Sequence, residues 1–379
     1  MPSRVHVVGG GVIGLACAWE LSRDGHEVTV LAPAPGRDGA GWVAAGMLAP
    51  ANEAQFGEAP LTRLRLEGVQ RWPKFAADLE AASGHAIGYD RSGTVTVALD
   101  ASDRASLDDL LAYQHSLGLA AHRRSASECR RLVPALSPAV RGGIEVPGDH
   151  QVDNRALLAA LLQACRVAGV SFEAGTVSEV APGPAVVLAD GRRLEADHLL
   201  LAAGTGLASI GGLEESGLPT VRPVKGHILR LGPFGTGHAP FLPRTVRGLV
   251  RGHSVYLVPR RDGSLVVGAT VEERGADTTV QAGAVHELLC DARAIVPGID
   301  ELALLEAVAG LRPATVDNTP CLGWTALDGV AVATGHFRNG ILLAPITAQA
   351  IADLIATGNA PVDLAPFAVD RFAMRTTWD

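Results

Sequence analysis

Apolar positions follow two different periods at the start of the chain, and their order predicts the first elements of the fold. A short apolar run at 5–8 predicts a buried strand, and it ends in the glycines of Gly9-x-Gly11-x-x-Gly14. Apolar residues then recur with helical spacing, and a second apolar run follows at 28–31. This order of strand, helix and parallel strand is the setting in which the glycine pattern indicates dinucleotide binding.

Each glycine of this pattern has its own physical role. Gly9 permits a tight turn, Gly11 allows a pyrophosphate to approach the backbone, and Gly14 lets the helix pack closely on the strand. Val12 and Ile13 open the helix, where unpaired N–H groups and the positive end of the helix dipole favour phosphate. We therefore expect these five residues to bind the cofactor.

One position departs from the fingerprint. An acidic residue at the end of the second strand normally accepts a hydrogen bond from the ribose. Here that position is Ala32, which has no side-chain acceptor. Either another group holds the ribose, or the cofactor is bound less tightly than the glycines suggest.

Further along the chain, helical and extended patterns alternate. Helices are predicted over 61–82, 102–132 and 153–168, and from near Pro345 to Gly358, while strands are predicted over 93–99, 171–180, 185–188, 194–204 and 330–334. The runs 254–259 and 265–270 flank Asp262-Gly263 and predict a hairpin. Tyr256 and Val258 should share one face of that hairpin.

Nucleotide-binding segments thus occur near the start, near residue 200 and near residue 335, with β-rich segments between them. We predict an α/β fold in which a Rossmann-type domain with a parallel sheet is discontinuous and an antiparallel sheet and helix domain for the substrate is inserted. The expected segments are 1–85, 146–218 and 306–379 for the cofactor domain, and 86–145 and 219–305 for the substrate domain.

Composition narrows the classes of function. The chain has 379 residues, of which 47% are hydrophobic and 19% charged, and its formal charge is −8 without long charged runs. This argues against nucleic acid and anionic membranes as partners. We also expect no secretion signal, because few residues precede the first strand, and no apolar window long enough to span a membrane.

The cysteines and histidines do not suggest a metal centre. The five cysteines are widely scattered without a CxxC pair, and the histidines show no HExxH spacing. We interpret the cysteines as reduced thiols, mostly buried, in a cytoplasmic protein. No metal is expected.

Six motifs carry a resemblance to a known family. They are Ala44-Ala-Gly-Met47-Leu-Ala-Pro50, Val224-Lys-Gly226, Tyr256-Leu-Val-Pro259, Val266-Val-Gly-Ala-Thr270, Gly310-Leu-Arg312-Pro313 and Gly335-His-Phe-Arg338-Asn-Gly340-Ile-Leu-Leu343. In this order, and over essentially the whole chain, they resemble the D-amino-acid oxidase-like FAD-dependent oxidoreductases, above all the glycine oxidase branch of thiamine (thiazole) biosynthesis.

The resemblance implies bound FAD and oxidative deamination of a small amino acid. Glycine, sarcosine and D-alanine are the expected substrates, with hydride transfer to flavin N5 and oxygen as the electron acceptor. Glycine would give glyoxylate, ammonia and hydrogen peroxide, with transfer of the imine to thiazole synthase as a further expectation. The family often forms homo-oligomers. Relatives with covalent flavin carry cysteine near position 310, so Gly310 implies non-covalent FAD.

The resemblance also assigns residues. Arg312 would pair with the substrate carboxylate, for which a planar guanidinium is suited, Tyr256 would hydrogen-bond the same group, and Arg338 and Met47 would complete the catalytic set. The remaining contacts expected with FAD are those of Ala45, Gly46, Met47, Val177, Ala203, Gly204, Gly310, Arg312, His336, Arg338, Asn339, Gly340 and Ile341. An ion pair between elements is the alternative role for Arg338.

Two other functions stay open. A D-amino-acid dehydrogenase would pass electrons to a quinone, and a non-catalytic subunit would have lost its flavin site. Gly41 stands where the family usually has serine, Gly206 where an aromatic residue is common, and Val271 where methionine can line the pocket. Gly41, Gly206 and Ala32 give some support to a non-catalytic subunit. Arg312 and Tyr256 argue against it.

Overall fold

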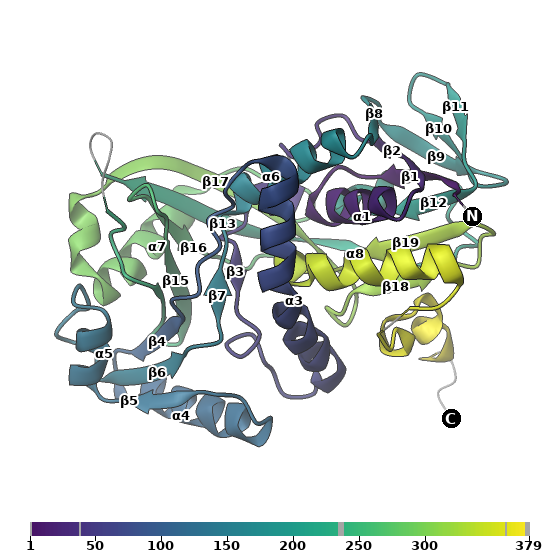
Figure 1. The fold of residues 1–379 in the computed structure, drawn as a ribbon. Helices are drawn as coiled ribbons and strands as arrows, with labels where there is room; N and C mark the ends of the chain where they lie inside the picture. Colours follow the sequence, from purple (N-terminus) through teal and green to yellow (C-terminus); the bar gives the residue numbers. More distant parts are fainter. Residues whose placement is uncertain (1, 38, 234–238, 361, 376–379) are drawn as a thin grey trace.

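Two large β-sheets lie at opposite ends of the molecule (Figure 1), and the active-site candidates lie where they meet. The computed structural model describes residues 2–37, 39–233, 239–360 and 362–375. Helices and sheets are mixed along the chain, so the predicted α/β class is confirmed.

The first sheet has six strands contributed by distant parts of the chain. In spatial order these are β18 (Cys321–Trp324), β19 (Val330–Thr334), β12 (His198–Leu201), β1 (Arg4–Val8), β2 (Glu27–Leu31) and β8 (Ser171–Glu173). All neighbours are parallel except β18 with β19. The predicted discontinuous parallel sheet is therefore confirmed, with one antiparallel strand at its edge.

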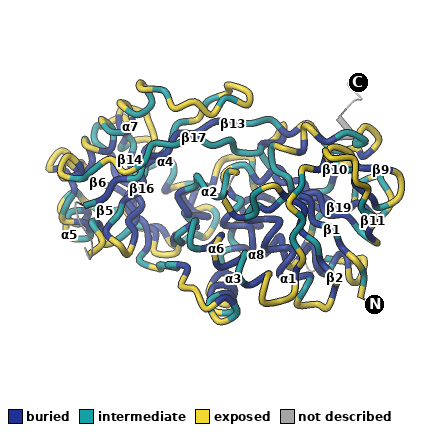
Figure 2. The backbone as a smooth tube through the Cα atoms, turned by 90° about the horizontal axis from the view of Figure 1, so that it is seen from above, coloured by how far each residue is buried: buried dark blue, intermediate teal, exposed yellow. Residues whose placement is uncertain are grey.

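Both faces of this sheet are covered. One face packs against α1 (Val12–Arg23), α3 (Ala59–Ser83), α6 (Asn154–Val167) and α8 (Gly340–Thr357), and the other against β9 (Val177–Ala181), β10 (Ala185–Leu188) and β11 (Arg193–Glu195). Alternate residues serve the two faces, since Val7 joins the helical core and Val8 the other. These strands are accordingly buried in Figure 2.

The second sheet has eight strands. In order they are β17 (Ala303–Ala314), β13 (Arg222–Gly232), β16 (Leu265–Gly268), β15 (His253–Pro259), β14 (Thr245–Val250), β4 (Thr94–Ala98), β6 (Gly142–Val146) and β5 (His122–Arg124). Only β14 and β4 pair in parallel. α5 (Ala126–Leu132) and α7 (Ala282–Ile295) pack on one face, and α4 (Ala101–Ser116) contacts β4 and β6.

The predicted hairpin is confirmed, and so is its division into faces. Val255 and Leu257 point into the core under α7, while Tyr256 and Val258 lie on the opposite face, which borders the space between the sheets. The remaining elements are short: α2 (Gly39–Val43), β3 (Met47–Leu48), β7 (His150–Gln151), and 3-10 turns at Gly204–Ser209, Pro297–Glu301, Ala365–Phe367 and Val369–Arg375.

Two predicted helices had wrong bounds. The helix predicted over 102–132 is divided by β5, because Gly118 adopts φ +71° after α4 and Ser125 caps α5 in a reciprocal pair with Glu128. α8 begins at Gly340, five residues before Pro345, which sits inside the helix. The proline lacks one N–H donor, yet the apolar face of α8 is buried along its whole length.

The predicted domain segments remain a prediction. β17 crosses the predicted boundary between residues 305 and 306. Residues 306–314 of this strand fall in the third cofactor segment, 306–379, although the strand pairs with β13 in the eight-stranded sheet along its length. At its end the Pro313 carbonyl accepts a hydrogen bond from Phe337 N, which precedes α8. β17 therefore joins the two halves of the protein.

The expectation that no apolar stretch is long enough to span a membrane is corrected by α8. Within the described residues it is the helix whose length and composition would suffice to cross a membrane. Of that 18-residue window, however, 72% is buried inside the protein. It packs against α1 and α3, as the core helix of a sheet-and-helix layer does.

The first βαβ unit requires two glycines for close approach. Gly9 adopts φ +118°, and a Cβ there would lie 2.5 Å from the Ala202 carbonyl oxygen. A Cβ on Gly14 would overlap the Gly9 carbonyl oxygen. The role predicted for Gly14, close packing of helix on strand, is therefore confirmed.

We expect Gly14→Ala to destabilise the protein by about 1–3 kcal/mol, the usual cost of overpacking. The melting temperature should fall by several degrees. Gly11→Ala is the matched control, because a Cβ there meets no protein atom within 4 Å. Equal melting temperatures for the two variants would contradict the packing argument.

Candidate active site

A cavity of about 520 Å³ lies between the carboxyl ends of β1, β12 and β19 and the eight-stranded sheet. Every residue predicted for the site lines this cavity except Gly14, which packs beneath it. In open parallel sheets this edge is where ligands bind. The structure thus brings together residues more than 300 positions apart in the sequence.

One end of the cavity has the features of a dinucleotide site. It is lined by Gly9, Gly11, Val12 and Ile13 at the start of α1, by Ala32 after β2, and by Val177, Ala203 and Gly204. Gly11 faces open space, and the first N–H groups of α1 have no partner within the helix. These features fit a pyrophosphate, while Ala32 offers the ribose no acceptor.

The N-terminus of α8 faces the same cavity. Gly340, Ile341 and Leu342 line it in the first turn of an 18-residue helix, so its free N–H groups and positive dipole end are available to a ligand. Thr334 Oγ1 and Asn339 Nδ2 are buried and have no partner in the protein. Unpaired buried groups of this kind fit the polar edge of a flavin ring.

Asn339 is held by a buried arginine. Its Oδ1 accepts a hydrogen bond of 2.9 Å from Arg65 Nε, which leaves only its amide N–H₂ group for a ligand. The remaining nitrogens of Arg65 donate to the Glu53 carbonyl and to the Glu58 carboxylate. The amide orientation of Asn339 is therefore set by its partner.

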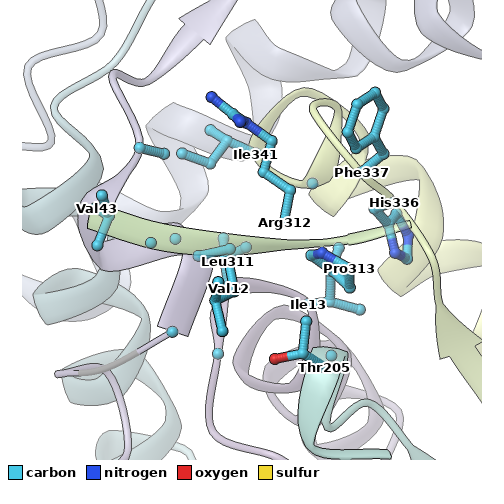
Figure 3. A pocket seen from close by; sticks show the side chains of 18 of the residues that line it. Val12, Ile13, Val43, Thr205, Leu311, Arg312, Pro313, His336, Phe337 and Ile341 are labelled. Atoms are coloured by element: carbon cyan, nitrogen blue, oxygen red, sulfur yellow. The ribbon is translucent and has the colours of Figure 1, made fainter. Parts of the chain in front are cut away.

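Arg312 projects from β17 into the cavity (Figure 3). Its Nη1 donates to the carbonyls of Lys225 and Thr270, both at 3.2 Å, which fixes the plane of the guanidinium. A Cβ on Gly226 would overlap that guanidinium, which explains the glycine of the Val-Lys-Gly motif. Burial lowers the pKa of Arg312 from its ordinary value, although neighbouring Tyr256 raises it.

Tyr256 lies beside Arg312 on the cavity face of β15. Burial raises the pKa of its phenol above the ordinary value of 10.0, even though Arg312 and Arg247 lower it. The hydroxyl therefore stays protonated at neutral pH and can donate a hydrogen bond. Together, a fixed guanidinium and a phenol form a binding site suited to a carboxylate.

Arg338 forms the ion pair between elements that is its alternative role, and it also lies at the cavity. It lines the cavity, and its Nη2 lies 3.0 Å from Glu53 Oε2. The other Glu53 oxygen accepts a 2.6 Å hydrogen bond from Arg247 Nη1. Burial alone would raise the pKa of Glu53, but Arg247 and Arg338 outweigh it and lower the pKa to about 2.

Sequence reasoning missed Glu53 and Arg247. Arg247 lies directly opposite Tyr256 in the register of β14 and β15, but no strand was predicted at 245–250. Glu53 follows Met47 in the same connecting segment. A single arginine within an otherwise apolar alternation, Thr245 to Val250, was the available signal.

Two predicted residues have simple environments. His336 is buried with Nε2 3.1 Å from Thr347 Oγ1, and burial lowers its pKa to about 3, so it is a neutral hydrogen-bonding group. Met47 packs against the apolar cluster of Ala45, Ile228 and Val258. Among the described residues, no group of three His, Cys, Asp or Glu side chains is arranged to hold a metal ion.

Comparisons with known proteins agree with this geometry. The family model of the FAD dependent oxidoreductases (DAO) matches residues 4–354. The chain is 32% identical to the glycine oxidase of Geobacillus kaustophilus, covering 97% of this chain and 96% of that protein. The crystal structure of glycine oxidase from Geobacillus kaustophilus superposes with a TM-score of 0.89, covering 97% of this chain and 99% of that one.

A further relative is longer than this chain. The bifunctional protein ThiO/ThiG of Synechocystis sp. is 35% identical over 99% of this chain. The match spans only 55% of that protein, so this chain corresponds to about half of it.

We expect Glu53→Gln to destabilise the protein by about 3 kcal/mol at neutral pH, because two arginines lose their buried counter-charge. The pKa of Glu53 is depressed in the folded state, so its contribution is complete above the unfolded pKa of about 4.3. It is lost as pH falls toward the folded value of about 2. Urea unfolding at several pH values measures this difference.

The control for this experiment is Glu195→Gln, which removes an exposed ion pair with Arg193. That variant should change the free energy of unfolding by no more than about 0.5 kcal/mol. A Glu53→Gln variant as stable as this control would disprove the buried role of Glu53.

Proposed function

The chain belongs to the family of FAD dependent oxidoreductases (DAO), and from this premise we propose that it is an oxidase of glycine and similar small amines. The family and its glycine oxidase members support FAD-dependent oxidation of amines or amino acids as the activity of this chain. The observation that carries the finer proposal is the pairing of Arg312 with Tyr256 in the cavity that α1 and α8 also face.

The residues of the cavity would hold FAD through backbone groups. The N-terminus of α1 would bind the pyrophosphate, and the N-terminus of α8 would lie at the flavin ring, where its positive dipole end favours negative charge. Bound FAD supplies the acceptor for the hydride that leaves the substrate carbon. Gly310 offers no side chain for a covalent bond, which supports non-covalent binding.

Arg312 and Tyr256 would orient the substrate. The guanidinium is already fixed by two backbone carbonyls, so it pairs with a carboxylate without losing further freedom. The Tyr256 hydroxyl adds a second donor to the same group. Two contacts at one carboxylate restrict the position of the α-carbon, which is the condition for a productive distance to the acceptor.

Proton transfer needs no histidine in this arrangement. His336 is neutral and bonded to Thr347, and Glu53 is a very weak base between its two arginines. The amine would therefore bind with its proton already released to water. Its α-hydrogen would then leave as hydride, and hydrolysis of the imine would give the corresponding oxo acid.

For glycine the balanced reaction consumes oxygen and water and yields glyoxylate, ammonia and hydrogen peroxide. The fusion of related domains in ThiO/ThiG supports the further proposal that the imine serves thiazole formation. Two alternatives are set against this function: a dehydrogenase that reduces a quinone, and a non-catalytic subunit. The fixed Arg312 beside Tyr256 favours catalysis over the non-catalytic alternative. Oxygen uptake distinguishes an oxidase from a dehydrogenase.

We expect the purified protein to be yellow, and its flavin absorbance to bleach when glycine is added without oxygen. Readmitted air should restore the colour with formation of hydrogen peroxide. If the flavin bleaches only with another amine, that amine and not glycine is the substrate. If a quinone but not oxygen restores the colour, the protein is a dehydrogenase. A colourless protein that does not bind added FAD would support the non-catalytic alternative.

We expect Arg312→Lys to lower kcat/KM for glycine about 100-fold through KM, because lysine cannot form the paired hydrogen bonds of a guanidinium. Flavin content should not change. Arg222→Lys is the matched control, since Arg222 lies outside the cavity and pairs with Glu273 and Asn318. If both variants kept the wild-type KM, Arg312 would not be the carboxylate ligand.

A further inference from the structure

The nucleotide end of the cavity has no acidic side chain. Among the described residues that line the cavity, the single Asp or Glu is Glu53, which lies at the substrate end between Arg247 and Arg338. Ala32 stands at the end of β2, where dinucleotide-binding folds usually place a carboxylate for the ribose. A ribose bound at this end therefore needs a different partner.

The neighbouring strand supplies one carboxylate, but that group is engaged elsewhere. β8 ends at Glu173, which lies opposite Leu31 in the register of β2 and β8 (Figure 1). The Glu173 carboxylate pairs with Arg192 Nη2 at 2.8 Å, and Glu173 is not among the residues that line the cavity. Its side chain therefore does not supply the missing acceptor.

The chain that follows β8 folds back beside Ala32. The Glu173 carbonyl oxygen accepts hydrogen bonds from both Ala32 N, at 3.2 Å, and Gly175 N, at 3.0 Å. Because the two amides share one oxygen, the turn over 173–176 lies directly beside the end of β2. Gly175 and Thr176 line the cavity together with Ala32. Thr176 is thus a polar side chain at the place where the ribose lacks its usual partner.

The hydroxyl of Thr176 is available to a ligand, whereas its backbone is fixed. The Thr176 carbonyl accepts a 2.8 Å hydrogen bond from Ala189 N. The next residue, Val177, is buried in the same apolar cluster as Leu31. Thr176 itself is exposed, and its hydroxyl has no hydrogen-bond partner within the part of the chain that the structure describes. A hydroxyl can donate and accept, so it suits a ribose hydroxyl.

Two further hydroxyls in the cavity belong to a different strand. Thr205 and Ser209 lie in the 3-10 turn that follows β12. β12 and β2 are on opposite sides of β1, so the ends of these two strands are about 10 Å apart. Ser209 Oγ also donates to the Gly206 carbonyl. The strand order therefore favours Thr176 over both.

We propose that Thr176 replaces the missing acidic residue, with its hydroxyl bonded to the ribose in the adenosine part of FAD. Both groups are neutral, so this bond is weaker than the charge-assisted bond that a carboxylate makes. Thr176 would accordingly be a cofactor-binding residue outside the glycine fingerprint. The inference concerns retention of FAD and holds whichever amine the protein oxidises.

Removal of the hydroxyl tests the proposal. Full-length holoenzyme dialysed to equilibrium against a series of FAD concentrations gives the Kd for FAD. We expect Thr176→Val, which keeps the shape of the side chain, to raise that Kd about three- to tenfold, the effect of one neutral hydrogen bond. Thr176→Ser keeps the hydroxyl and should change the Kd by no more than about twofold.

Glu173→Gln is the matched control, because Arg192 holds that carboxylate away from the cavity. This variant should bind FAD as tightly as the wild type. A wild-type Kd for Thr176→Val would overturn the proposal. If Glu173→Gln weakened binding and Thr176→Val did not, the ribose would belong to Glu173 instead.

A modified cofactor identifies the group that Thr176 binds. An FAD analogue built on 2′,3′-dideoxyadenosine lacks both ribose hydroxyls and keeps the pyrophosphate and the flavin. We expect the wild type and Thr176→Val to bind this analogue with equal Kd. If Thr176→Val weakened binding of the analogue as much as binding of FAD, Thr176 would not contact the ribose and the proposal would be wrong.

Two further measurements separate a lost contact from a structural defect. The melting temperatures of the two proteins freed of FAD should be equal, since the Thr176 hydroxyl has no partner in the described protein. At saturating FAD, kcat and KM for the amine should also be equal, because Thr176 and Arg312 lie at different ends of the cavity. A lower kcat at saturating FAD would contradict a role confined to the ribose.

Discussion

The pairing of β13 with β17 determines where the substrate end of the site lies. β17 is hydrogen-bonded to β13 along nearly its whole length, which fixes Arg312 relative to the hairpin that carries Tyr256. At the other end, Pro313 accepts a hydrogen bond from Phe337, and Ala314 bridges to His336 just before α8. One strand therefore holds Arg312, the proposed carboxylate ligand, at a fixed position between the hairpin and the helix N-terminus.

The arginines of this site differ in whether they have a carboxylate partner. Buried arginines are costly unless they are paired, and Arg247 is paired with Glu53 at 2.6 Å. Arg312 has backbone carbonyls and a phenol as partners but no carboxylate of its own. A guanidinium in that state is solvated by dipoles and still lacks a counter-charge. A bound anion would supply that counter-charge.

The sequence predicted the parts of the fold that depend on short-range signals. The glycine fingerprint, the start of α6 beside Asp153, and the hairpin around Asp262-Gly263 each lie within a few residues of the structure they produce. The start of α8 was misplaced because burial against α1 and α3 outweighs the missing donor of Pro345. Glu53 and Arg247 were missed for another reason: they meet only through pairing of segments 194 positions apart, which no local pattern encodes.

Amino-acid substitutions should therefore affect the two ends of the cavity differently. At the nucleotide end the donors are backbone N–H groups at the starts of α1 and α8, and these persist whatever side chains stand nearby. Loss of one side-chain acceptor at Ala32 removes one contact and leaves the phosphate site in place. At the substrate end the partners are the side chains of Arg312, Tyr256 and Arg338, so a single substitution there changes charge and shape together. This asymmetry explains how the chain can lack a ribose acceptor at Ala32 and still offer a phosphate site, while under the proposed function its choice of amine would depend on a few side chains around the second sheet.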